Sequence, residues 1–304
     1  MDLVDKTIMI EIASNCRISY ENLSKRTGLS ANAVKNRVTA LLESGTISRF
    51  AVSLNAAMIN ASYFMALVTT DGTEDIDGFI GRMGENPMIG HISLLASAAG
   101  GAYLVWGQYI GSAMLSKLRR FLRKHDKVRH VELHTIIAPV GKKIELANLH
   151  LRILSVLKNN PRALINDIAQ ETGLAPKTVR RGIRELVEDG GIYFSARPDM
   201  AAGKIVNFFV RFEYNEDEIG LDEVVKWLQE TYPLELWDPT PSATEPMFFA
   251  EFVVEYLHEA EEIARFIRSQ SFVKSTTTLV SYSSKKFPYL AETMLEDMIR
   301  DAGY

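Results

Sequence analysis

Residues 27–54 read TGLSANAVKNRVTALLESGTISRFAVSL, and this stretch sets the architecture of the N-terminal part of the chain. Gly28 suits the end of a short helix, because a residue without Cβ adopts the left-handed conformation at little cost. Ser30 is placed to cap the next helix, since its hydroxyl can accept a hydrogen bond from a free backbone N–H. That helix carries one apolar stripe at helical spacing, made of Val34, Val38, Leu41 and Leu42. Gly45 ends the helix, and 46–54 has the pattern of a β-strand or wing.

The same pattern returns 145 positions later, where residues 172–199 read TGLAPKTVRRGIRELVEDGGIYFSARPD. The match runs without a gap from 5–57 onto 150–202. Solenoid repeats have periods of roughly 20–50 residues, so a period this long indicates a duplicated domain instead. Each copy predicts three helices, with a tight turn before the third, followed by a β element. This is the plan of a winged helix-turn-helix.

A different pattern follows each copy of that module. After the first copy we expect helices at 74–83 and 112–125, with strands at 63–70, 89–95, 102–110 and 128–137. After the second copy we expect helices at 218–232 and 259–268, with strands at 205–214, 235–239, 247–255 and 273–282. Both follow the order βαββαβ of a ferredoxin-like domain, whose helices cover one face of a sheet. The other faces are then free to pack against each other, which predicts a pseudo-dimer.

The sequence therefore predicts an α+β fold, in which two winged helix-turn-helix domains alternate with two ferredoxin-like domains. The expected limits are 1–57 for the first winged helix-turn-helix, 58–140 for the first ferredoxin-like domain, 141–202 for a linker and the second winged helix-turn-helix, and 203–304 for the second ferredoxin-like domain with a C-terminal helix. The composition, with 47% hydrophobic and 24% charged residues, is that of an ordinary globular protein.

Several classes of protein are disfavoured by composition. Cys16 is the single cysteine, so we expect neither a disulfide framework nor a cysteine-based metal site. Acidic residues stand near the start where a signal peptide has a basic region, which predicts a cytoplasmic protein. From Asn86 to Ser116 no residue is charged, a length sufficient to cross a bilayer. Polar residues and the Gly100-Gly101 turn within this stretch favour a buried β-hairpin over a membrane span.

The face opposite the apolar stripe is the one that a DNA groove would meet. We expect DNA contacts from Ser30, Asn32, Lys35, Asn36, Arg37 and Thr39 in the first copy, and from Lys177, Thr178, Arg180, Arg181 and Arg184 in the second. Asparagine can pair with an adenine edge, and arginine can bind guanine or phosphate. The alternative is that these residues form ordinary solvated helix faces. Charge is uneven along the chain: 205–304 holds 8 basic and 19 acidic side chains, whereas the regions before it are mildly basic.

The chain resembles the leucine-responsive regulator/AsnC (Lrp/AsnC) family of transcription regulators, in a tandem-duplicated form. The resemblance is carried by Leu3-Val4-Asp5-Lys6-Thr7-Ile8, Ile18-Ser19, Leu23, Thr27-Gly28-Leu29-Ser30, Val34, Arg37-Val38, Leu41-Leu42-Glu43, Gly45-Thr46-Ile47 and Arg49. That family joins a winged helix-turn-helix to a βαββαβ effector and oligomerisation domain. The resemblance implies a regulator that binds double-stranded DNA and forms homo-oligomers, built here on an intrachain pseudo-dimer.

The resemblance also implies a place for a small-molecule effector. Family members commonly carry a Gly-Asp-Tyr-Asp-like segment between the second and third strands of the βαββαβ domain. The matching residues are Gly100, Gly101, Ala102 and Tyr103, which keep the glycines and the tyrosine but lack the acids. In the second half, 239–246 contains no glycine. An effector site is therefore expected in the first half, and an amino-acid effector is doubtful.

Two polar clusters leave alternatives open. His130, Glu132 and His134 alternate along one strand and share a face, so they could bind zinc or nickel. Their counterparts in the second half are Ser275, Thr277 and Leu279, which favours a polar interface, and we expect no metal and no cofactor. A second cluster is basic and consists of Lys117, Arg119, Arg120, Arg123, Lys124, Lys127 and Arg129. It could contact phosphates, complement the acidic half, or be a solvated surface.

An enzyme is the alternative class of function. Siroheme decarboxylases are similar in having this two-part architecture and use histidine and arginine near the second and third strands. His91 and Tyr103-Leu104-Val105-Trp106 resemble their pattern, but 92–102 holds no basic residue to complete it. No phosphate-binding glycine loop, nucleophile elbow or carboxylate pair stands out, so we expect no catalytic residues. A third class, a non-specific architectural DNA-binding protein, would show flat sequence preference.

Overall fold

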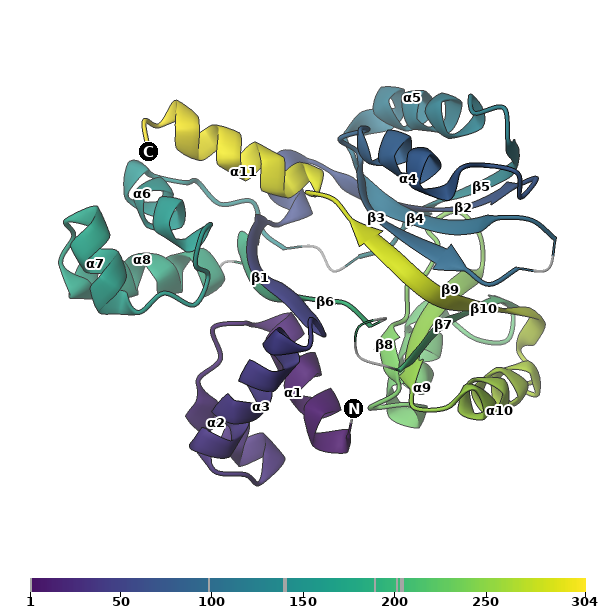
Figure 1. Ribbon diagram of the computed structural model, residues 1–304, viewed down its shortest axis with the longest axis horizontal. Coiled ribbons are helices and arrows are strands. Elements are labelled where there is room, and N and C mark those ends of the chain that lie inside the picture. The colour runs from purple at the N-terminus through teal and green to yellow at the C-terminus, as the bar shows by residue number, and fades with distance from the viewer. Residues whose placement is uncertain (1, 98, 139–140, 189, 201, 203–204) are drawn as a thin grey trace. The chain divides into compact units, whose positions relative to one another are not determined.

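The computed structural model describes residues 2–304 except 98, 139–140, 189, 201 and 203–204. The chain forms two compact units (Figure 1). The sheet unit comprises 62–139 and 200–288, and the winged-helix unit comprises 2–61, 140–199 and 289–304. Each unit therefore collects one segment from each half of the repeat. Equivalent domains pair with each other inside one chain, as expected for a pseudo-dimer.

The winged-helix unit contains both helix-turn-helix copies and the last helix of the chain. The first copy has α1 (Leu3–Ser14), α2 (Tyr20–Thr27), α3 (Ala31–Glu43), β1 (Ile47–Leu54) and the short 3₁₀ helix η1 (Ala56–Ile59). The second has α6 (Asn148–Leu157), α7 (Ile165–Thr172), α8 (Pro176–Glu188) and β6 (Ile192–Pro198), and α11 (Leu290–Asp301) follows much later. Gly28 and Gly173 end α2 and α7 at φ 72° and 64°, in the left-handed region that the sequence predicted.

The β elements of the two copies pair with each other. Each copy contributes one strand, and β1 and β6 form a two-stranded antiparallel sheet in which Phe50 lies opposite Ala196 and Ser53 opposite Tyr193. Helix α11 packs against β1, η1 and α6. A wing in the usual sense closes within its own domain, whereas here the strand of each copy is completed by the other. The two helix-turn-helix copies are consequently held together by backbone hydrogen bonds.

The sheet unit contains both βαββαβ modules, which confirms the predicted fold class. The first module has β2 (Ser62–Thr70), α4 (Ile76–Gly84), β3 (Ile89–Leu95), β4 (Ala102–Tyr109), α5 (Gly111–Arg123) and β5 (Val128–Ile136). The second has β7 (Val206–Tyr214), α9 (Leu221–Thr231), β8 (Leu236–Asp238), β9 (Met247–Val254), α10 (Leu257–Arg268) and β10 (Val273–Lys286). The uncharged stretch after Asn86 forms the β3–β4 hairpin, as predicted. Among the described residues no helix is long and apolar enough to cross a membrane.

All eight strands of this unit join in one sheet, in the order β5-β2-β4-β3-β10-β7-β9-β8. The connection is β10, a strand of 14 residues whose first part pairs with β7 and whose last part pairs with β3. At the far end, Ile136 of β5 bridges to Ser242, close to the start of β9. The two half-sheets are thus joined at both edges.

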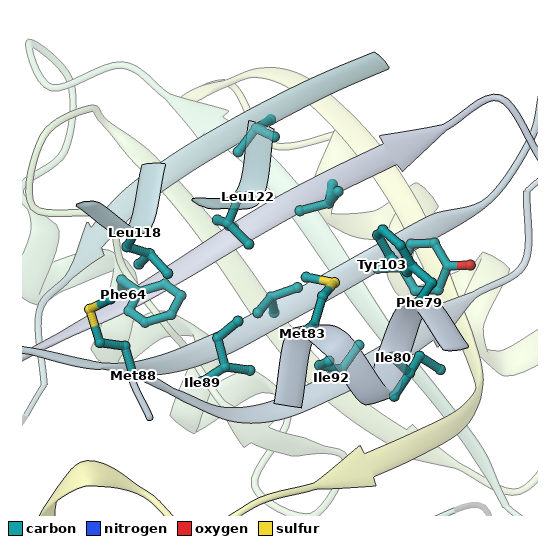
Figure 2. Close-up of a cluster of buried hydrophobic side chains, with 14 of the residues drawn as sticks. Phe64, Phe79, Ile80, Met83, Met88, Ile89, Ile92, Tyr103, Leu118 and Leu122 are labelled. Carbon is teal, nitrogen blue, oxygen red and sulfur yellow. The ribbon is translucent and has the colours of Figure 1, made fainter. Parts of the chain in front are cut away.

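Three apolar clusters divide the sheet unit into layers. One lies between α4 and α5 and the first half-sheet, where side chains such as Phe79 and Leu118 point onto the strands (Figure 2). Another lies between α9 and α10 and the second half-sheet. The third joins the inner faces of the two half-sheets through Met65, Leu104, Phe209 and Phe249. The half-sheets therefore pack face to face, and helices form the two outer layers.

Candidate nucleic-acid interface

Helix α3 presents its polar side to solvent. Val34, Val38 and Leu41 are buried, while the side chains of Asn32, Lys35, Asn36 and Thr39 are exposed. The Ser30 hydroxyl caps the helix by accepting a hydrogen bond from the Ala33 N–H at 3.2 Å. Within the described ranges, the amides of Asn32 and Asn36 have no hydrogen-bond partner. This surface therefore offers unoccupied amides and a single nearby cation, Lys35.

Arg37 occupies a different side of α3 from the one the sequence suggested. Its guanidinium pairs with Asp2 at 2.7 Å and with Asp5 at 2.8 Å, both at the start of the chain. These hydrogen bonds, from Asp5 first and Asp2 second, raise the pKa of Arg37 above its usual value. Its structural role is therefore to hold α3 to α1. The equivalent residue in the second copy is Gly182, where a Cβ would lie 2.6 Å from Ile153, so that α8 packs directly on α6.

Helix α8 presents cations where α3 presents amides. Lys177, Arg180, Arg181 and Arg184 are exposed, and Thr178 is half-buried. Arg181 approaches Glu185 at 3.5 Å and Arg184 approaches Glu188 at 3.8 Å, each one helical turn away. Surface pairs of this kind contribute little and exchange readily. Ala175 stands where Ser30 caps the first copy, so the two recognition helices differ in their starts as well as in their charge.

Two arginines at equivalent positions of the repeat, Arg17 and Arg162, bind the two helix-turn-helix copies to each other. Arg17 donates to the carbonyl oxygens of Pro161 at 2.5 Å and Ala163 at 3.0 Å. Arg162 donates in return to the carbonyl oxygens of Cys16 and Ile18. The repeat aligns these arginines, and the structure shows them exchanging contacts, as residues do across a two-fold dimer interface.

The arginines are also packed against aromatic rings of the same unit. Arg162 lies over Tyr20 at 4.8 Å and over Phe50 at 5.4 Å, and Arg17 lies over Phe194 at 5.6 Å. Burial lowers the pKa of Arg17 and raises the pKa of the adjacent Cys16 thiol to about 11. The thiol therefore stays protonated near neutral pH, which makes it a poor nucleophile.

A buried carboxylate ties the C-terminal helix to the paired strands. Glu292 of α11 accepts hydrogen bonds from Arg49 of β1 at 2.9 Å and from Arg197 of β6 at 2.5 Å. The Arg197 guanidinium also lies 5.1 Å from the centre of the Tyr289 ring. No local pattern in the sequence predicts this contact, because α11 is separated from both strands by the whole second ferredoxin-like module.

The expected effector residues form a tightly packed turn. Gly100 has φ 123°, and a Cβ there would lie 2.6 Å from the Thr70 carbonyl oxygen. A Cβ on Gly101 would collide with the side chains of Glu74 and Thr70. The Tyr103 hydroxyl donates to Glu74 at 2.6 Å. Both glycines are therefore required by the close approach of the segment from Thr70 to Glu74, whether or not a ligand binds.

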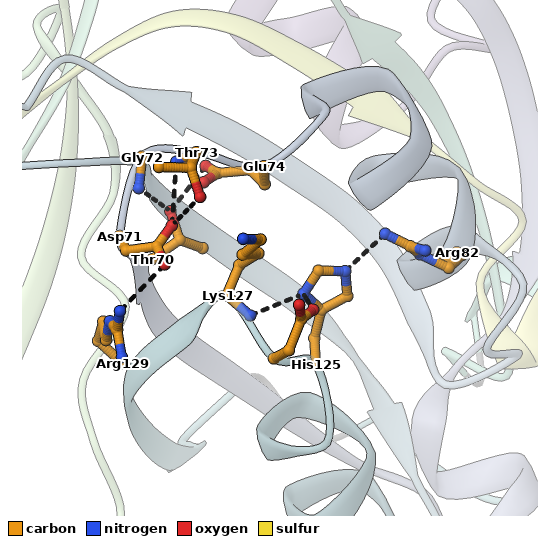
Figure 3. Close-up of polar contacts among 10 residues, drawn as sticks. Thr70, Asp71, Gly72, Thr73, Glu74, Arg82, His125, Lys127 and Arg129 are labelled. Atoms are coloured by element: carbon orange, nitrogen blue, oxygen red, sulfur yellow. Dashed lines mark hydrogen bonds and ion pairs between the residues drawn. The ribbon is translucent and has the colours of Figure 1, made fainter.

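Glu74 lies beside this turn and accepts hydrogen bonds from Thr70 and Tyr103. Burial opposes its charged form, but hydrogen bonds from Thr70 and Tyr103 outweigh that effect and hold its pKa below the usual value. Its Oε2 is buried with no hydrogen-bond partner among the described residues. The segment from Thr70 to Glu74 also contacts β5, because Asp71 pairs with Arg129 of that strand at 3.0 Å (Figure 3).

His130, Glu132 and His134 do not converge on one point. His134 is buried and contacts Ser242 at 3.1 Å and Glu132 at 3.0 Å, whereas His130 is exposed. Glu132 also accepts two hydrogen bonds from Arg211 of the other half-sheet. The bonds from His134 and Arg211 lower the pKa of Glu132 to about 2. The polar face of β5 thus forms an ionic interface between the half-sheets, and in the described parts of the chain no group of three His, Cys, Asp or Glu is arranged to hold a metal.

Glu251 of β9 gives a prediction on stability and pH. It is half-buried and accepts a hydrogen bond from Asn207 at 2.8 Å, and burial raises its pKa to about 7. The folded state then binds more protons than the unfolded state between pH about 4.5 and 7, so the free energy of unfolding falls as pH rises through that window. We expect Glu251→Gln to remove this decline and to stabilise the protein at pH 8 by about 1–3 kcal/mol.

Urea unfolding at pH 5 and pH 8 measures this effect of Glu251. Glu262→Gln serves as the control, because Glu262 is exposed on α10. The prediction is contradicted if Glu251→Gln and Glu262→Gln change the free energy of unfolding by the same amount at each pH.

Comparison with known proteins agrees with the two helix-turn-helix copies. A family model described as winged helix-turn-helix DNA-binding matches residues 1–48 and again 146–192. Each copy matches that model separately. The two matches agree with the tandem winged helix-turn-helix domains that the sequence predicted.

Curated relatives match over a limited region. An uncharacterized HTH-type transcriptional regulator of Pyrococcus abyssi is 35% identical over 69 residues, and one of Pyrococcus horikoshii is 33% identical over 69 residues. These matches cover 23% of this chain and 41% of each relative. The chain thus spans less than half the length of the relatives it matches.

Solved structures extend the likeness to the whole chain at the level of fold. The siroheme decarboxylase NirDL is 14% identical, covers all of both chains and has a TM-score of 0.57. Its complex with an iron-uroporphyrin III analogue has a TM-score of 0.54 over 99% of both chains. At this identity the comparison shows a shared fold and nothing about chemistry.

Proposed function

We propose that this chain is a sequence-specific transcription regulator that binds double-stranded DNA through α3 and α8. The observation that carries the proposal is the pair of DNA-binding-family domains whose third helices both expose polar side chains. Base contacts come from Asn32 and Asn36, and phosphate or guanine contacts come from Lys35, Lys177, Arg180, Arg181 and Arg184. Ser30 at the start of α3, Thr39 within α3 and Thr178 within α8 add further contacts. Arg37 is left out because Asp2 and Asp5 bind it.

The two recognition helices are held in one unit but carry different side chains. A homodimer of single regulators presents the same helix twice and favours a palindromic site. In this chain each half-site meets a different surface, so we expect a bipartite site with unlike halves. If whole chains associate further, symmetry returns at the level of that larger assembly.

Selection from a randomised duplex library with the full chain tests the proposal. Enrichment of a two-part, non-palindromic motif supports it. A flat profile with tight binding would indicate an architectural DNA-binding protein, and failure to bind any duplex would exclude DNA as the partner.

Asn36 should contribute to specificity rather than to general affinity. We expect Asn36→Ala to cost about 1–3 kcal/mol on the selected site and little on unrelated duplexes, because an asparagine that reads adenine contributes to discrimination between bases. Fluorescence anisotropy with both kinds of duplex measures the difference. Asn159→Ala is a matched control, since Asn159 is also exposed but lies at the end of α6. A uniform loss on all duplexes would assign Asn36 to backbone contacts instead.

An effector site near Gly100, Gly101, Ala102 and Tyr103 stays part of the proposal. The unpartnered Oε2 of Glu74 beside this turn would accept a hydrogen bond from a donor group on a ligand. A small molecule that alters DNA affinity, and loses this effect in Glu74→Gln, would support the site.

A tetrapyrrole enzyme is the second candidate, favoured by the full-length fold match to siroheme decarboxylase. In this chain His91 of β3 stacks on Trp106 of β4 at 5.0 Å, an arrangement that could face a planar ligand. Titration of the protein with siroheme, followed by absorbance and by product mass, separates the candidates. Binding and decarboxylation that survive Asn36→Ala but not His91→Ala would favour the enzyme.

A further inference from the structure

Helix α5 and its C-cap carry an uninterrupted basic surface. The basic ridge consists of Lys117, Arg119, Arg120, Arg123 and Lys124, all exposed. Within the described residues none of these side chains forms an ion pair. Arg119 and Arg123 are one turn apart, as are Arg120 and Lys124, and like charges at this spacing destabilise a helix by roughly 0.2–0.5 kcal/mol per pair. The ridge therefore has a repulsive cost that an external anionic partner would relieve.

An acidic surface of equal charge lies on the other half of the same unit. The acidic ridge consists of Glu216, Asp217, Glu218, Asp222 and Glu223, in the loop before α9 and its first turn. All of these are exposed, and among the described residues none is paired with a cation. Their hydrogen bonds are local: Glu218 accepts from Asn215 and Glu223 accepts from the Gly220 N–H.

The two ridges cannot meet within one chain. Helix α5 packs on the outer face of the first half-sheet and α9 on the outer face of the second, and the inner faces of the half-sheets pack against each other between them. The sheet unit therefore carries the basic ridge on one outer layer and the acidic ridge on the other. Complementary surfaces on opposite sides of one molecule can bind only between molecules, in a head-to-tail contact.

The surroundings of the basic ridge favour protein over nucleic acid. Helix α4 covers the same half-sheet and carries exposed Asp75 and Asp77 at its start. These carboxylates lie on the same outer layer as the ridge and would repel the phosphates of a DNA backbone laid across it. The acidic ridge also has a cation nearby, Lys226 of α9, so both surfaces are mixed at their margins. Mixed margins suit the polar rim of a protein interface.

We propose that the basic ridge of one copy binds the acidic ridge of a second copy. The contact is heterologous, so an assembly keeps one unused basic ridge at one end and one unused acidic ridge at the other, and association propagates with concentration. It weakens with salt, because exposed charges are screened within about 10 Å at 0.1 M ionic strength. The contact does not involve the recognition helices and is independent of the proposed function.

Sedimentation of the full chain without DNA, from 50 to 500 mM NaCl, tests this contact. We expect larger species at low salt and the basal species at high salt. A basic-reversed variant (Lys117→Glu, Arg120→Glu, Arg123→Glu) should lower the association constant at low salt at least about tenfold, as expected for losing three exposed ion pairs. An acid-reversed variant (Asp217→Lys, Asp222→Lys, Glu223→Lys) should behave in the same way. Mixing the two variants should restore association.

The recovery on mixing guards against misfolding, because a variant that fails to fold cannot regain a specific contact. Lys142→Ala with Lys143→Ala, which removes two exposed cations before α6, is the control and should assemble as the unchanged protein does. Salt-independent assembly, or no recovery on mixing, would overturn the proposal. So would unchanged assembly of the basic-reversed variant together with weaker binding to unrelated DNA, which would assign the ridge to phosphate contacts.

Discussion

Replacing both Arg181 and Arg184 by alanine should weaken binding to every DNA sequence. It should also flatten the slope of log K against log salt by about one to two units, because each phosphate neutralised by a cation releases condensed counterions. The two guanidinium groups are well exposed, at 58% and 63%, and their contacts with Glu185 and Glu188 are long. Exchanging such contacts for phosphates costs little. The second copy is thus predicted to be the electrostatic anchor of the regulator.

Fluorescence anisotropy across a salt series measures this slope for the arginine pair. The matched control is Lys226→Ala with Arg265→Ala, which removes two exposed cations that also form one-turn pairs, with Glu230 and Glu261. The control should leave the slope unchanged. If the arginine variant also leaves it unchanged, the second helix-turn-helix is a structural remnant or a protein-binding surface.

Removing Arg17 and Arg162 together should uncouple the two helix-turn-helix copies. Each arginine donates to two carbonyl oxygens of the opposite copy and packs on an aromatic ring. Hydrogen bonds from charged donors contribute about 1.5–3 kcal/mol each, so the double alanine variant should lose about 3–5 kcal/mol from the winged-helix unit. Affinity for the bipartite site should fall more than affinity for either half-site, because the second binding event loses its high effective concentration.

Thermal unfolding and anisotropy on whole and half sites together measure this uncoupling. Arg26→Ala is the control, since Arg26 pairs with Glu11 inside its own copy. Arg17→Lys with Arg162→Lys keeps the charge but removes the guanidinium, which donates from two nitrogens at once. This variant should therefore resemble the alanine variant. Equal losses on half and whole sites would mean that the arginines stabilise each copy separately rather than their arrangement.

The sequence predicted the local elements well because their signals are local. Gly28, Ser30 and the stripe through Val34 determine a turn, a cap and a buried face within a few residues of each other. The order βαββαβ likewise follows from hydrophobic periodicity within each module. The domain limits drawn from these patterns remain predictions.

Contacts between distant segments were not predictable in the same way. The last strand was expected at 273–282, but β10 continues through the polar residues SYSSKK at 281–286. In the structure those residues pair with β3, since the partner strand supplies hydrogen bonds that composition does not reveal. Arg37 is a similar case: helical spacing placed it near the DNA surface, and only the position of α1 shows that Asp2 and Asp5 bind it.

The contact between Arg17 and Arg162 has a consequence for how such a protein can change over time. In a dimer of identical subunits one codon specifies both members of a symmetric contact, so any substitution appears on both sides at once. Here separate codons specify the two positions, and the same holds for Asn36 and its counterpart Arg181. Selection can therefore preserve the contacts of Arg17 and Arg162 while the exposed faces of α3 and α8 diverge. A single gene can then acquire asymmetric recognition one mutation at a time.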